Sequence, residues 1–168
     1  MLKQVFDILA TTPENLKWEI QTTSLRELRT RPAPNKWSVQ EVLAHLDDVE
    51  ELGMRCRVAA MIEQETPLLP SFDQEERGRE MGYSTRNAKR SLASLARQRR
   101  VNLAWLRKLK PSQLKRKGVH AKVGEITVEE LITEWAFHDL GHLKQILEIK
   151  RYGLYPRIGN MRAFYQLT

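Results

Sequence analysis

Apolar residues recur at helical spacing in four long stretches of the chain, and helix-start and helix-stop residues separate these stretches. The first helix is predicted over residues 13–29. Thr12 is its expected N-cap, and Pro13 takes the first helical position, where the missing N–H does no harm. The prolines in residues 31–35 then indicate a loop.

The second helix is predicted to begin at a capping box formed by Ser38 and Glu41 and to continue to about residue 65. Two prolines follow, and the charged residues 71–82 are expected to form a short helix or an ordered connection. The third helix is predicted over residues 85–109, where leucines recur at helical spacing.

Residues 111–126 are expected to form a loop, with a short strand pair over residues 119–126. The last long helix begins at a second capping box, formed by Thr127 and Glu130, and extends to about residue 151, before a glycine and a proline. No strand pattern is long enough for a substantial sheet. These elements predict an all-α protein, a four-helix bundle with short connecting helices and loops, in a single domain over residues 1–168.

Composition agrees with a globular protein and excludes several other classes. Of 168 residues, 41% are hydrophobic and 29% are charged, which is unlike disordered or fibrous chains. No window approaches the roughly 20 apolar residues that cross a bilayer, and the first residues are too polar for a secretory signal. Cys56 is the single cysteine, so no disulfide forms within the chain and a cytoplasmic location is expected.

The charge is unevenly distributed along the chain. The formal net charge is +7, and residues 86–117 hold twelve basic and no acidic residues, whereas residues 41–80 hold eleven acidic and four basic ones. The basic stretch, which includes the third helix, could bind nucleic acid. A solvated basic helix face is the favoured interpretation, because no nucleic-acid-binding motif accompanies the charge.

Three of the four histidines fall on apolar helix faces. His138 and His142 lie about 40° apart around the helix axis and about 6 Å apart along it, so both can reach one ion. They share their side of the helix with Val128, Leu131, Trp135, Ile146 and Ile149. His45 is in line with Val42, Val49, Leu52 and Cys56. The three imidazoles are therefore expected to face the bundle interior, either as a metal site or as unrelated buried histidines.

Other polar residues allow two interpretations each. Cys56 lies about 16 Å from His45 along a straight helix, which excludes a shared ion and favours a buried structural thiol. His120 could cover the site or bind substrate, but an exposed loop histidine is favoured. Asp48 and Glu134 lie one turn from the proposed ligands. Each is a weak candidate for orienting an imidazole or accepting a proton, and equally for an ordinary ion pair.

Two motifs resemble the DinB/YfiT-like superfamily. They read WSVQEVLAHLDDVE over residues 37–50 and HDLGHLKQI over residues 138–146, with GEIT at 124–127 before the last helix. The resemblance implies a four-helix bundle whose divalent metal is held by His45, His138 and His142 with open coordination positions. It also implies a possible homodimer, and it does not imply DNA binding. Characterised branches include transferases and isomerases that use low-molecular-weight thiols.

The sequence therefore favours a divalent-metal-dependent enzyme, a thiol-dependent transferase or a hydrolase, acting on a small-molecule substrate. Zinc and nickel are the expected metals, since imidazole accepts several transition metals. A non-catalytic metal or small-ligand binding module is the alternative, and nucleic-acid binding is less favoured. Residues 161–168 pack on the bundle or on a partner, and the sequence does not decide between the two.

Overall fold

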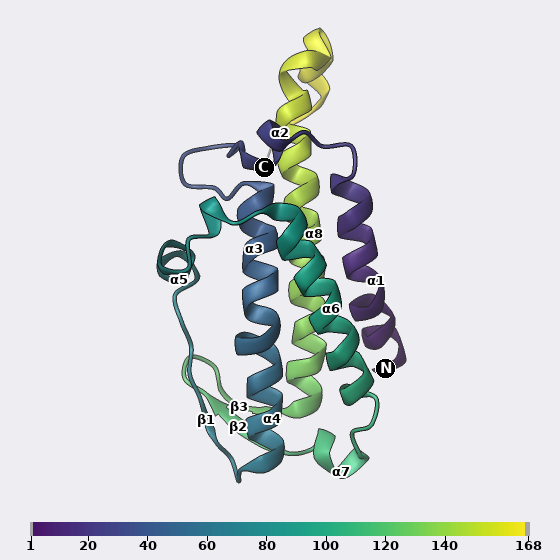
Figure 1. The fold of residues 1–168 in the computed structure, drawn as a ribbon, viewed down its shortest axis with the longest axis vertical. Coiled ribbons are helices and arrows are strands. Elements are labelled where there is room, and N and C mark those ends of the chain that lie inside the picture. Colours follow the sequence, from purple (N-terminus) through teal and green to yellow (C-terminus); the bar gives the residue numbers. More distant parts are fainter. Residues whose placement is uncertain (1, 167–168) are drawn as a thin grey trace.

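The computed structural model describes residues 2–166, in which four long helical segments pack side by side with a small sheet at one end (Figure 1). The predicted four-helix bundle is confirmed. The segments are α1 (Leu2–Ile20), α3 (Val39–Val49) with its continuation α4 (Cys56–Glu63), α6 (Ala88–Leu106) and α8 (Val128–Leu154). Both predicted capping boxes are present, at the starts of α3 and α8.

The helices do not simply alternate in direction. In Figure 1, α1 and α8 run upward, whereas α3 and α6 run downward. The segment between α4 and α6 returns along the outside of the bundle and carries α5 (Gln74–Glu80). α8 contacts both α1 and α3, so the helix with two histidines lies beside the helix with the third.

A small sheet lies beside α4 near one end of the bundle (Figure 1). β2 (Lys117–His120) pairs antiparallel with β3 (Gly124–Thr127), which confirms the predicted strand pair. β1 (Leu68–Leu69) pairs parallel with β2 and was not predicted, because two residues are too few to show a strand pattern. Gly118 lets this sheet approach α4 closely, since a Cβ at that position would lie 2.9 Å from Cγ of Met61.

Besides α5, three short helical segments connect the long ones within residues 2–166, and a fourth follows α8. α5 lies inside the predicted connection of residues 71–82, and its N-cap is Asp73. α7 falls in a stretch predicted as a loop, which is a small error. The segments are α2 (Leu25–Arg29), η2 (Tyr83–Thr85), α7 (Pro111–Leu114) and the 3₁₀ segment η3 (Tyr155–Phe164).

The predicted start of the first helix is wrong. Thr12 is not an N-cap, because α1 begins at Leu2 and contains Pro13 in its interior. Pro13 cannot donate to the carbonyl of Leu9, four residues earlier. The guanidinium of Arg99 fills that gap, since its Nη1 donates to the Leu9 carbonyl at 2.9 Å. A buried side chain of α6 thus makes a proline acceptable within α1.

The second helix contains a π-helical turn, η1 (Glu50–Arg55), that the sequence pattern did not indicate. This π-helical turn adds a residue to the helical repeat. The side chains of the turn and of the helix after it are therefore rotated around the helix axis. Leu52 and Cys56 are therefore exposed, and the prediction of a buried Cys56 thiol is wrong. The buried face continues instead through Gly53, Met54, Val58 and Met61.

α8 extends beyond the bundle, and its predicted end at about residue 151, before Gly153, falls short of the observed end. The helix continues to Leu154 and passes into η3, which forms the projecting tip in Figure 1. Three large apolar side chains of this extension are exposed: Leu154, Met161 and Phe164. Residues 161–166 do not pack in the core, and residues 167 and 168 lie outside the described part of the chain.

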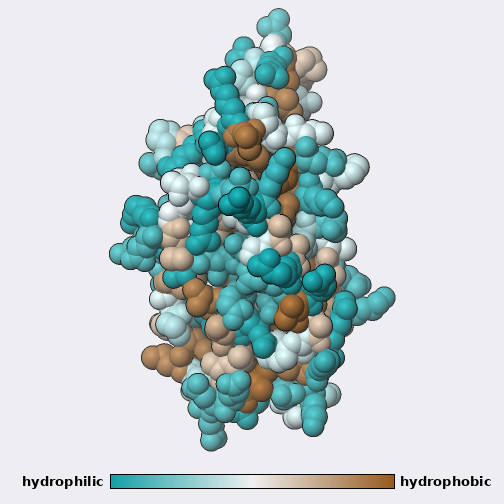
Figure 2. Space-filling model, in the orientation of Figure 1, coloured by the Kyte–Doolittle hydropathy of each residue, from teal (hydrophilic) through white to brown (hydrophobic). Residues whose placement is uncertain are grey.

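The face seen in Figure 2 is largely hydrophilic, with apolar side chains in small separate areas. Within residues 2–166, no helix is both long and apolar enough to span a membrane.

Candidate metal centre

The structure brings His45 of α3 together with His138 and His142 of α8. Nε2 of His138 lies 3.2 Å from Nε2 of His45 and 3.1 Å from Nε2 of His142. One ligand atom from each residue lies within 4.8 Å of the others. His45 is buried and the other two are half-buried, so three imidazole nitrogens meet at one point inside the bundle.

These imidazoles are neutral at physiological pH. Burial is the main cause, and it lowers the pKa of His45 to about 2 and that of His138 to about 3. The neighbouring histidines contribute further to both decreases. Burial also lowers the pKa of His142, although its hydrogen bond to Gln145 opposes the change. Neutral imidazoles have the lone pair that a metal requires.

One tautomer is set by a hydrogen bond. Nδ1 of His142 donates to Oε1 of Gln145 at 2.8 Å, so its Nε2 has no proton and points a lone pair at the cluster. Nδ1 of both His45 and His138 is buried without a hydrogen-bond partner. Of two facing Nε2 atoms, at most one can donate a hydrogen bond to the other. Hydrogen bonds among the three converging nitrogens therefore satisfy them poorly.

A divalent ion fits this donor set. A tetrahedral zinc ion with Zn–N bonds of about 2.0–2.1 Å separates two ligand nitrogens by about 3.3 Å. The observed separations of 3.2 and 3.1 Å are close to that value. Three neutral imidazoles leave at least one coordination position for a substrate or solvent, the pattern of catalytic rather than structural zinc sites.

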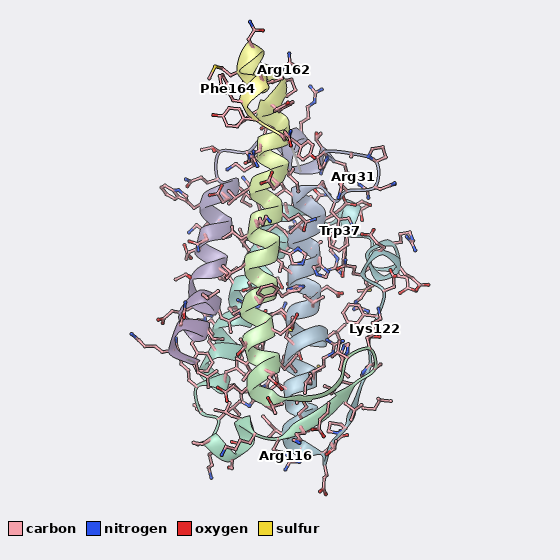
Figure 3. All side chains as sticks on the ribbon, turned by 180° about the vertical axis from the view of Figure 1, so that it is seen from behind. Arg31, Trp37, Arg116, Lys122, Arg162 and Phe164 are labelled. Atoms are coloured by element: carbon pink, nitrogen blue, oxygen red, sulfur yellow. The ribbon has the colours of Figure 1, made fainter. Side chains whose placement is uncertain are left out.

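Aromatic rings from the loop before α3 and from η2 hold the imidazoles in place. The ring of Trp37 stacks on His142, with centroids 6.4 Å apart, and contacts His45 at 4.9 Å. Tyr83 meets His45 edge to face at 6.0 Å. Figure 3 places Trp37 beside α3, in the upper half of the bundle.

Asp48 holds the ring of Tyr83 in place and makes no hydrogen bond to a histidine within the described residues. Its carboxylate accepts a hydrogen bond from the hydroxyl of Tyr83 at 2.8 Å and pairs with the guanidinium of Arg77. Asp48 therefore acts on His45 through the position of Tyr83. Of the two interpretations that the sequence allowed for Asp48, the ion pair is the one seen in the structure.

A buried charge cluster links the ligand-bearing helices. Arg99 of α6 donates to both carboxylate oxygens of Glu50 and to both oxygens of Asp139, the residue after His138. Asn102 and Trp135 also donate to Glu50. Arg99, which belongs to the basic stretch, is 2% exposed and is thus unavailable to nucleic acid.

A cavity of about 560 Å³ opens beside the histidines. His45 and His138 line it together with Glu134, which is one turn before His138 on α8. Glu134 faces solvent through the cavity, and partial desolvation by the cavity walls raises the pKa of its carboxyl. His120 also lines the cavity from β2 and is half-buried, so the favoured interpretation of an exposed loop histidine is wrong.

The fold and the site together define a class of protein: a four-helix bundle with a three-histidine cluster suited to one divalent ion and open to a cavity. A family model described as the DinB superfamily matches residues 8–146. The chain belongs to that superfamily, as its two motifs suggested.

Similar proteins are named as metal-dependent enzymes. The chain is 27% identical over 145 residues to "Putative metal-dependent hydrolase YfiT" of Bacillus subtilis, covering 86% of this chain and 81% of that protein. It is 26% identical over 137 residues to OB0782 of Oceanobacillus iheyensis, which is named in the same way, covering 82% and 78%. A solved structure of Bacillus subtilis YfiT, described as an unusual four-helix bundle, has a TM-score of 0.82 at 25% identity and covers 89% and 85%.

Proposed function

We propose that the protein is a metal-dependent hydrolase of small molecules, with His45, His138 and His142 as the ligands of its divalent ion. The observation that carries this proposal is the convergence of three neutral imidazole nitrogens, two of which come from His45 and His138 in the wall of a cavity of about 560 Å³. A purely structural ion needs no cavity beside it, so the alternative of a non-catalytic binding module is less favoured. The names of the relatives agree with hydrolysis.

A divalent ion, when bound, supplies Lewis-acid chemistry: it lowers the pKa of water and polarises a carbonyl group. The protein supplies position and proton transfer. Trp37 and Tyr83 fix the ring of His45, and the hydrogen bond that His142 donates to Gln145 fixes the tautomer of His142. Zinc and nickel remain the expected metals, because both accept imidazole ligands.

Glu134 is the proposed general base. It lines the cavity with His45 and His138, and no hydrogen bond or ion pair occupies its carboxylate among the described residues. A carboxyl with a raised pKa can accept a proton from the attacking water and return it to the leaving group. Its position on α8, four residues before His138, keeps it beside the cluster.

The test is a hydrolysis assay on protein loaded with zinc or nickel, with a panel of esters and amides. We expect turnover by the loaded protein and none by the His142→Ala variant. A parallel panel pairs low-molecular-weight thiols with electrophilic acceptors. Turnover in that panel alone would replace hydrolysis by thiol transfer, and inactivity in both panels would favour the binding module.

A further inference from the structure

Besides His45, His138 and Glu134, the cavity is lined by a second set of polar groups, where α4 meets the sheet. Arg57, His120 and Lys122 all line it. Arg57 is half-buried on α4, His120 ends β2, and Lys122 lies at the tip of the β2–β3 hairpin, as Figure 3 shows. We call these three residues the basic wall.

Strand pairing places the basic wall in the cavity. His120 is the register partner of Leu69 in β1, and Pro70 follows directly. Nη2 of Arg57 donates to the carbonyl of Pro70 at 2.6 Å, which holds its guanidinium at the end of the sheet. The ring of Phe72 lies 5.6 Å from the same guanidinium. Arg57 is therefore fixed in position before any ligand arrives.

The basic wall has unused hydrogen-bond donors. The carbonyl of Pro70 is the one hydrogen-bond acceptor that Arg57 reaches in the described chain, so Nε and Nη1 are available. Nδ1 of His120 accepts from the backbone N–H of Lys122 at 3.3 Å, which leaves the proton on Nε2. The ammonium of Lys122 makes no hydrogen bond or ion pair within residues 2–166.

The acidic groups of the cavity do not neutralise this wall by contact. Glu134 is near enough to Arg57 to affect its pKa, but the two form no ion pair within 4.0 Å. Asp73 caps α5 by accepting the backbone N–H groups of Glu75 and Glu76. Desolvation is the main cause of the lowered pKa of His120, and the charges of Arg57 and Lys122 lower it further. The effect of these two charges indicates a positive potential at His120.

We propose that the basic wall binds an oxyanion, a carboxylate or phosphate group, on the substrate whose reactive bond lies at the three histidines. An arginine fork with imidazole and ammonium donors is suited to such a group. The cavity volume of about 560 Å³ accommodates a small molecule that reaches from one end to the other. The role as a substrate site rests on the proposed hydrolase function, whereas the binding of an oxyanion does not.

The test measures binding without turnover. Isothermal titration of the whole protein uses glutarate and inorganic phosphate as probes, with glutaramide as the uncharged control. We expect one or both anions to bind and glutaramide to bind at least tenfold more weakly. Binding of glutarate alone would assign a carboxylate, and binding of phosphate alone a phosphate group. Failure of wild-type protein to bind either anion overturns the proposal.

Variants locate the site. Arg57→Met is expected to weaken anion binding at least tenfold, and Lys122→Met, an exposed change that leaves the core intact, several-fold. Arg116→Met is the matched control, because Arg116 is also half-buried and donates to backbone carbonyls but does not line the cavity. Equal affinities for wild type, Arg57→Met and Lys122→Met contradict the proposal.

A carboxylate could also bind a metal directly, so the titration is repeated on the His142→Ala variant. Anion binding that survives there supports the basic wall even if the hydrolase proposal fails. Anion binding lost in His142→Ala but unchanged in Arg57→Met assigns the anion to the metal centre and overturns the basic wall.

Discussion

At the residue scale, Glu134 is the side chain on which the proposed chemistry depends most. We expect Glu134→Gln to lower kcat about 100-fold, because the amide cannot accept the proton of the attacking water. Metal content should be unchanged, since Glu134 does not belong to the histidine cluster. The measurement is kcat with the best substrate of the panel, together with elemental analysis.

Glu129→Gln is the matched control for that prediction. Glu129 lies on the first turn of the same helix and does not line the cavity. Its variant should keep wild-type kcat. If Glu134→Gln does so as well, Glu134 is not the general base.

The residues that gather at the centre could be predicted from the sequence, because helical spacing alone aligned His138 with His142 and put His45 on an apolar face. Asp48 and Glu134 were found by the same spacing, but spacing could not separate their roles. Asp48 proves to be bound by Arg77 and Tyr83, which are far away in sequence. The role of Arg57 was missed, since it depends on a strand of two residues that carries no signal.

At the element scale, Arg99 connects its own helix, α6, to the other three helical segments. It donates to Leu9 of α1, to Glu50 at the start of η1 and to Asp139 of α8. Its carboxylate partners are nearly fully buried, so its loss leaves two acidic groups without a counter-charge.

We therefore expect Arg99→Met to lower the free energy of unfolding by about 3 kcal/mol or more. Arg100→Met, an exposed change on the same helix, should alter it by less than about 0.5 kcal/mol. Urea denaturation of both variants measures the difference. Similar stabilities would show that the buried cluster contributes little.

Pro13 offers a second test of the same contact. Alanine at this position would restore a backbone donor for the carbonyl of Leu9. Arg99→Met should consequently cost about 1 kcal/mol less in a Pro13→Ala background than in wild type. A double-mutant cycle in urea measures this coupling. A coupling of zero would show that Arg99 does not compensate for the backbone donor that Pro13 lacks.

Long-range contacts explain the errors in element boundaries. Pro13 is an ordinary helix-start signal. Its place inside α1 depends on the guanidinium of Arg99 in α6, which lies 90 residues after the Leu9 carbonyl that it binds. The π-turn of η1 likewise changes which side chains are buried without any proline or glycine pair to mark it. The capping boxes were predicted correctly because they are local: both partners lie within one turn.

At the scale of the whole molecule, the fold class followed from four amphipathic stretches, but the directions of the helices did not. The long connection between α4 and α6 makes α3 and α6 run the same way, and no local signal encodes that choice. The sequence does not predict the extension of α8 and η3 beyond the bundle, because glycine often ends a helix. Gly153 lacks the positive φ typical of such an end and lies inside α8.

The buried histidines also predict how the stability of the metal-free protein depends on pH. Burial holds the pKa of His45 and His138 near 2 and 3, against a reference value of 6.5. Below about pH 6.5 the unfolded chain takes up protons that the folded chain does not, so stability is complete above that pH and is lost as the pH falls.

The measurement is the urea midpoint of metal-free protein at several pH values between about 5 and 7. Wild type should lose stability over this range, and a variant with glutamine in place of His45, His138 and His142 should lose much less. Parallel curves for the two proteins would mean that these histidines are not held neutral by burial.

The metal content of protein purified without a metal-binding tag tests whether the three imidazoles share one divalent ion. We predict about one divalent ion per chain for wild type and a sharp loss in each of His45→Ala, His138→Ala and His142→Ala, with the helical circular dichroism retained. Metal content that is negligible in wild type after exposure to zinc and nickel, or unchanged in all three variants, would show that the three histidines do not share an ion.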